Sequence, residues 1–174
     1  GMDLARAPHA VRRRLGVVSH ESFLSGALSA RENLEFYAGM FEVPRPGERV
    51  AEAAGAVGLS DRLDDPVRTF SRGLRQRCAI ARALLHEPEI LLFDEPFAGL
   101  DPLAADDLRE LLRRARGDGR TVVLTSHDLE RGRDLADRLV VLLRGRVALD
   151  ARAADLSASE LADRYRGLSG RSHP

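Results

Sequence analysis

The chain has 174 residues, 44% hydrophobic and 31% charged, which favours a globular protein and excludes a disordered tail. Basic and acidic residues both number 27, so the net charge of zero gives no overall attraction to nucleic acid or anionic membrane. A single cysteine excludes an internal disulfide, and the chain contains no lysine. No apolar run reaches the roughly 18 residues of a membrane span, and no apolar signal region opens the chain, so we expect a cytoplasmic protein.

The first half of the chain predicts one strand followed by helices. The apolar, β-branched run 15–19 predicts a buried strand. Ser29 and Glu32 have capping-box spacing, and Ser71 precedes an apolar stripe with helical periodicity. These signals predict helices at about 29–43, 49–57 and 71–86, with a loop at 43–47 and an irregular stretch at 61–70. Residues 29–86 contain no convincing strand, so we expect a helical insert.

The second half alternates strands and helices. The run 89–94 is apolar throughout and ends in an acid, which is typical of a parallel strand buried on both faces; 121–126 predicts another buried strand. Asp101 followed by proline is typical of a helix start. Helices are expected at about 101–117, 128–136 and after Ser157, with a hairpin formed by 138–143 and 146–149. This alternation predicts an α/β fold.

Two pairs of residues suit phosphate chemistry. Asp94 ends an apolar strand, where a carboxylate can hold hydrated Mg²⁺, and the adjacent Glu95 can orient an attacking water. Ser71 and Gly73 open a helix, where backbone N–H groups face an anion and glycine permits close approach. Taken singly, an acidic turn or a serine cap would explain these residues.

Two further segments follow in the same order along the chain. Residues 99–101 read Gly-Leu-Asp, and His127 comes directly after the predicted strand 121–126. Asp101 alone is explained as a helix cap, and a lone histidine is more often structural than functional. The fixed order of all four segments is what favours a shared function.

Together, these motifs resemble the ATP-binding subunit of an ABC transporter. Segment 70–74 resembles the signature, 90–95 the Walker B strand with catalytic Glu95, and 99–101 the D-loop; His127 falls at the switch histidine and His20 at the Q-loop glutamine. Arg72 replaces the first glycine of the usual signature and Leu74 its glutamine. With His20 and the Arg31–Leu34 segment, these departures are similar to haem-exporter and drug-efflux relatives.

The resemblance implies a partial P-loop NTPase (RecA-like) core with a parallel sheet and an inserted α-helical subdomain. Residues 1–28 would be core with the Q-loop strand, 29–86 the helical subdomain with the signature helix, and 87–174 core with Walker B, D-loop and switch histidine. It implies ATP and Mg²⁺ as cofactors, with Glu95 and His127 catalytic. The implied nucleotide contacts are Ser71, Gly73, Asp94, Asp101 and His20, with Asp94 also serving the metal.

The implied partners are transmembrane permease subunits and a second ATP-binding subunit, identical or different. No nucleic acid is implied, and the chain would lie at the inner face of the plasma membrane. The family's phosphate loop, Gly-x-x-x-x-Gly-Lys-[Ser/Thr], requires a lysine that this chain lacks. We therefore expect Met2 to fall inside a truncated domain, and the chain alone to bind MgATP weakly and not to hydrolyse it.

The alternative is a non-catalytic remnant or regulatory partner, which donates Ser71 and Gly73 to a complete subunit's site in trans. A DNA-repair ATPase with the same motifs is set aside, because 29–86 is too short for the long coiled coil of those proteins and carries no heptads.

Overall fold

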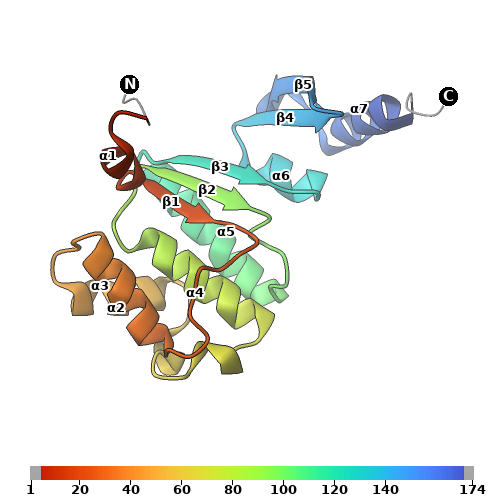
Figure 1. The fold of residues 1–174 in the computed structure, drawn as a ribbon. Helices are drawn as coiled ribbons and strands as arrows, with labels where there is room; N and C mark the ends of the chain where they lie inside the picture. The colour runs from red at the N-terminus through yellow and green to blue at the C-terminus, as the bar shows by residue number, and fades with distance from the viewer. Residues whose placement is uncertain (1–4, 171–174) are drawn as a thin grey trace. The chain divides into compact units, whose positions relative to one another are not determined.

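The computed structural model describes residues 5–170, and the chain divides at 124/125 into two compact units (Figure 1). Met2, which we expected to fall inside a truncated domain, lies outside the described residues. The first unit contains, in chain order, α1 (Pro8–Arg12), β1 (Leu15–Val18), α2 (Ala30–Met40), α3 (Pro46–Ala56), α4 (Arg72–Leu84), β2 (Ile90–Asp94) and α5 (Pro102–Gly117), with β3 (Thr121–Thr125) reaching its boundary. The second contains α6 (Leu129–Leu135), β4 (Arg138–Leu143), β5 (Arg146–Arg152) and α7 (Ala158–Gly170). Within the described range, no helix combines the length and the apolar character that crossing a membrane requires.

The sheet of the first unit has the strand order β1-β2-β3. β1 and β2 are parallel, and their register runs from Leu15 opposite Ile90 to Val18 opposite Phe93. The connection between these two strands contains α2, α3 and α4. The predicted α/β fold with a parallel sheet and an inserted set of helices is therefore confirmed.

One face of the sheet packs against helices, and the side chains on the opposite face are half-buried or exposed in the described part of the chain. Val18, Leu91 and Phe93 are buried, and a β-carbon at Gly16 would lie 2.5 Å from the carbonyl oxygen of Ala83 in α4. α4 and α5 lie on the same side of the sheet (Figure 1). Side chains alternate along a strand, so Val17 points to the opposite face, where it is 38% exposed.

The expectation of strands buried on both faces is therefore wrong. In β2, only alternate residues are fully buried, and Val123 of β3 is 54% exposed. The apolar runs reflect the strand propensity of residues such as valine, isoleucine and phenylalanine, while burial depends on what covers each face.

The helices expected between residues 29 and 86 are confirmed, with changed boundaries. α2 begins after Ser29, whose capping box with Glu32 is formed, and α4 begins after Ser71. α3 begins at Pro46 rather than 49, because proline suits the first position of a helix. α1, which also opens on a proline, was not expected. α2, α3 and α4 contact one another, and their buried side chains include Leu34, Ala38, Val50, Ala54, Cys78 and Ile80.

The second unit consists of an antiparallel hairpin and two helices. β4 and β5 pair from Arg138 opposite Arg152 to Leu143 opposite Arg146, with an irregularity between Val141 and Leu142. Asp128 caps α6, and a reciprocal cap between Ser157 and Glu160 opens α7. The hairpin and both helix starts were predicted correctly, although β5 is longer than expected.

Candidate functional site

The end of β2 presents two adjacent carboxylates. Asp94 is the last residue of the strand and is exposed, and Glu95 follows it half-buried. Glu95 has φ +48°, a left-handed backbone conformation that is costly for a residue with a β-carbon. Glu95 begins the loop 95–101, which connects β2 to α5.

The start of α4 exposes backbone N–H groups beside a residue without a side chain. The Ser71 hydroxyl accepts a hydrogen bond of 3.2 Å from the Leu74 N–H, which makes Ser71 the N-cap. Ser71 is exposed and Gly73 half-buried. Helix N-termini carry partial positive charge, so this end of α4 is suited to an anionic group.

The loop 95–101 packs directly on the first turns of α4. A β-carbon at Gly73 would lie 3.2 Å from the carbonyl oxygen of Gly99. Gly99 has φ +79°, and a β-carbon there would meet Cδ of Arg72 at 2.7 Å. Gly99 is favoured by its left-handed backbone and Gly73 by a tight contact, and two predicted segments, 71–73 and 99–101, are in contact.

Two side chains further along α4 hold the same loop. Gln76 donates a hydrogen bond of 3.1 Å from Nε2 to the carbonyl oxygen of Pro96, and Arg77 lies 3.5 Å from the Asp101 carboxylate. The sequence analysis missed Gln76 and Arg77. Their spacing from Gly73, three and four residues, places all three on one helix face and was the available signal.

Asp101 caps α5 and is held in its charged form. Its Oδ1 accepts a hydrogen bond of 2.9 Å from the Ala104 N–H. This hydrogen bond, followed by the charge of Arg77, lowers the pKa of Asp101 below its ordinary value of 3.8. Asp101 therefore caps α5 and at the same time lies beside α4.

The two histidines lie in different units. His20 is exposed in the loop after β1, where the Ser19 hydroxyl donates a hydrogen bond of 3.0 Å to the Glu21 carbonyl oxygen. His127 is exposed in the second unit, between Ser126 and the cap residue Asp128, whose N–H donates to the Ser126 hydroxyl at 3.1 Å. The contacts between the start of α4 and the loop that begins with Glu95 lie within the first unit.

The donor set suits a magnesium ion that arrives with a nucleotide. Among residues 5–170, no group of three or more histidine, cysteine or acidic side chains is arranged to hold a metal ion. Mg²⁺ is commonly bound through one or two carboxylates together with substrate phosphates and waters. The exposed carboxylate of Asp94 at a strand end fits that requirement.

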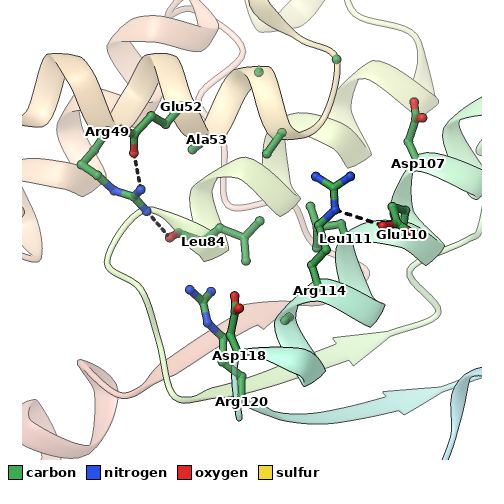
Figure 2. A pocket seen from close by; sticks show the side chains of 14 residues that line it. Arg49, Glu52, Ala53, Leu84, Asp107, Glu110, Leu111, Arg114, Asp118 and Arg120 are labelled. Carbon is green, nitrogen blue, oxygen red and sulfur yellow. Dashed lines mark hydrogen bonds and ion pairs between the residues drawn. The ribbon is translucent and has the colours of Figure 1, made fainter.

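A groove in the first unit lies elsewhere, between α3 and α5 (Figure 2). It has a volume of about 510 Å³, and no predicted site residue lines it. On its rim, Arg49 pairs with Glu52 and donates to the Leu84 carbonyl oxygen, and Arg114 pairs with Glu110. These rim charges are paired within the chain; because no predicted site residue lines the groove, it is separate from the candidate site.

Comparison with known proteins decides the family. A model described as "ABC transporter" matches residues 1–98. The ABC transporter ATP-binding protein NatA of Bacillus subtilis (strain 168) is 32% identical over 181 residues, covering 97% of this chain and 74% of that protein. The chain belongs to the ATP-binding subunits of ABC transporters. Members of this family bind ATP with Mg²⁺, form dimers and work with transmembrane permease components.

Other ABC ATP-binding proteins are similarly related. The daunorubicin resistance ATP-binding protein DrrA3 of Streptomyces coeruleorubidus is 36% identical over 94% of this chain, which spans about half (52%) of that relative's length. A solved ATP-binding subunit of an ABC transporter superposes with a TM-score of 0.88 and 29% identity over 97% of this chain and 74% of that one. The ATP-binding cassette MJ0796, solved as a dimer in a post-hydrolysis state bound to ADP and Pi, gives a TM-score of 0.78 and 27% identity over 87% of this chain and 68% of that one.

Proposed function

We propose that this ABC ATP-binding chain forms the signature side of a nucleotide site and serves export through separate membrane subunits. The observation that supports it most is the contact of Gly73 with Gly99, which joins the signature turn to the loop that begins with Glu95. Relatives named for daunorubicin resistance favour an exported, drug-like substrate. Under this proposal, the chain lies at the inner face of the membrane because it binds its permease. Nucleic acid is not among the proposed partners.

Each residue has a proposed role in that site. Mg²⁺ bound with ATP would neutralise charge on the phosphates. The Asp94 carboxylate supplies an oxygen ligand for that ion, and Glu95 orients and deprotonates the attacking water. Ser71 and the amide of Gly73 bind a terminal phosphate held by a partner subunit.

The remaining proposed residues align these groups. Asp101 keeps the D-loop against α4 while it caps α5. His127 and His20 would contact the γ-phosphate side, with His20 at the edge where a permease docks. We assign 1–28 and 87–174 to the nucleotide-binding core and 29–86 to the helical subdomain.

A second candidate is a regulatory partner that gives Ser71 and Gly73 to a complete subunit without catalysing hydrolysis. It is favoured by one feature of these 174 residues, which include no lysine and hence no Gly-x-x-x-x-Gly-Lys loop. Under both candidates, this chain by itself has weak affinity for MgATP and no turnover, because backbone amides at one helix start are its main phosphate contacts.

The test mixes this chain with a complete ABC ATP-binding subunit whose own signature serine has been replaced. We expect this chain to stimulate ATP hydrolysis by the mixture, and expect Ser71→Ala to abolish the stimulation. Arg75→Ala, an exposed position one turn along the same helix, is the matched control and should leave it unchanged. No stimulation by the wild-type chain would overturn both candidates.

Glu95→Gln separates the two candidates in the same assay. If this chain's own carboxylate activates water, the substitution removes the stimulation. If the chain only donates its signature turn, the stimulation survives, because hydrolysis then uses the partner's glutamate.

A further inference from the structure

Arg82, in the second half of α4, is a buried charged residue that the proposed mechanism does not use. It is 9% exposed, and among residues with a described side chain only Asn33 joins it as a buried polar group. Charged side chains are seldom buried without strong partners. Burial lowers the pKa of the Arg82 guanidinium, yet arginine remains protonated in proteins, so a fixed cation lies inside this unit.

One hydrogen bond of Arg82 is directed to β1, and the Tyr37 hydroxyl of α2 also interacts with its guanidinium. One terminal nitrogen donates a hydrogen bond of 2.6 Å to the carbonyl oxygen of Val17. Its Nε is buried without a hydrogen-bond partner in the described part of the chain. The Arg82 side chain thus bonds to β1 while one of its buried N–H groups has no hydrogen bond.

Two aromatic rings complete the surroundings of the cation. The guanidinium carbon lies 5.4 Å from the centroid of the Phe23 ring and 5.1 Å from that of Tyr37 in α2. Distances below about 6 Å are favourable for cation–π attraction. The Tyr37 hydroxyl also donates a hydrogen bond of 2.6 Å to the Phe23 carbonyl oxygen, where the backbone has φ +53°.

These contacts fix both sides of His20. Val17 precedes His20 by three residues and Phe23 follows it by three, and both are in contact with Arg82. His20 itself is exposed between them. The segment 17–23, which carries His20, is therefore held at both of its ends by a side chain of α4.

We propose that Arg82 is a positioning residue that sets the conformation of the loop carrying His20 and couples that loop to the signature helix. The role of His20 toward the nucleotide rests on the proposed function. The coupling itself rests on the Val17, Phe23 and Tyr37 contacts alone.

A purely structural role for Arg82 predicts a different outcome from a positioning role. Loss of ordinary core packing lowers the stability of the whole unit, so amide protection falls together in α4, α5 and the loop. Loss of a positioning contact opens the loop locally and leaves the helices protected. Amide hydrogen exchange read peptide by peptide distinguishes the two.

The experiment compares native-state hydrogen exchange of the full chain with that of Arg82→Met, which keeps length but removes charge and donors. We expect exchange of amides 19–25 to rise about tenfold or more, with α5 unchanged. Arg82→Lys, which keeps a cation near both rings, should recover part of this protection. Arg75→Met, exposed on the same helix, is the control and should change neither region.

An unchanged loop, or a rise of equal size in α5, overturns the proposal. If Arg82→Met does not fold, Tyr37→Phe decides by the same comparison, because it removes the hydroxyl that interacts with the Arg82 guanidinium and donates to Phe23. No nucleotide is present in these measurements, so their outcome is independent of whether the proposed nucleotide function is correct.

Discussion

The side chain of Arg72 lies across Gly99 so closely that a β-carbon there would meet Cγ, Cδ and Nε of the arginine at 2.7–2.9 Å. Arg72 falls in the segment that resembles the signature, at a position where the family usually has glycine, and Gly99 falls in the segment that resembles the D-loop. The arginine side chain fills the space beside the Gly99 backbone. Residues 71–73 and 99–101 are therefore packed against each other in this chain.

Gly99→Ala should destabilise the protein for two reasons. Its backbone is left-handed, and the added β-carbon would meet the Arg72 side chain. We expect the free energy of unfolding to fall by about 1–2 kcal/mol from the left-handed conformation alone, measured by urea denaturation. In an Arg72→Ala background, the loss should shrink toward that backbone value. Gly39→Ala, where the added carbon meets nothing within 4 Å, is the control; an equal effect there would contradict the argument.

Substitutions at Ser71 should separate capping from phosphate binding. Ser71→Ala removes the acceptor for the Leu74 N–H, and we expect stability to fall by about 1 kcal/mol. Ser71→Asp keeps a capping oxygen, so its denaturation midpoint should match wild type. Both variants should fail to stimulate hydrolysis in the mixed assay, since aspartate repels a phosphate. Full stimulation by Ser71→Asp would argue against a phosphate contact at this position.

Cys78 should report the opening of the signature helix. Burial raises the pKa of its thiol to about 12, and the side chain is fully buried. At pH 8 the thiol would therefore stay protonated, and reagents cannot reach it in the folded chain. We expect negligible reaction with a disulfide reagent in native buffer and complete reaction in denaturant. Rapid native labelling would show that α4 is not packed as described.

Asp101 should contribute a pH-dependent part of the stability. Its pKa is lowered in the folded protein, so the carboxylate stabilises the fold fully above its ordinary pKa of 3.8. That contribution is lost as the pH falls from this value through the lowered one. Asp101→Asn caps without charge, and the difference in unfolding free energy between the two proteins should vanish at acid pH. A difference that stays constant down to pH 2 would exclude this linkage.

Local signals predicted the elements that carry the candidate site. Ser71, Asp101 and Ser29 each cap the helix that their sequence context indicated, and the acid-ended apolar run forms β2. Such features depend on side chains bonding to backbone a few residues away, so a single sequence contains them. The order of the motifs then indicated the family, which the comparisons establish.

Features that depend on distant residues were not predicted. Arg82 looks like any helical arginine, and only the approach of Val17, Phe23 and Tyr37 reveals that it is buried. The burial of the strands was also misjudged, because an apolar run does not indicate whether one or two faces are covered. The contacts of Gln76 and Arg77 lay within helical reach of Gly73 and could have been inferred from their spacing.

The left-handed backbone of Glu95 has a consequence for engineering. At such a turn, glycine or asparagine would relieve a strain of about 1 kcal/mol or more. Glutamate at this place therefore costs folding stability, and a glycine or asparagine there should raise the melting temperature. Under the role proposed for Glu95, redesign guided by stability alone would remove the carboxylate that is proposed to activate water, so heat resistance and the stimulation of hydrolysis should diverge at this position.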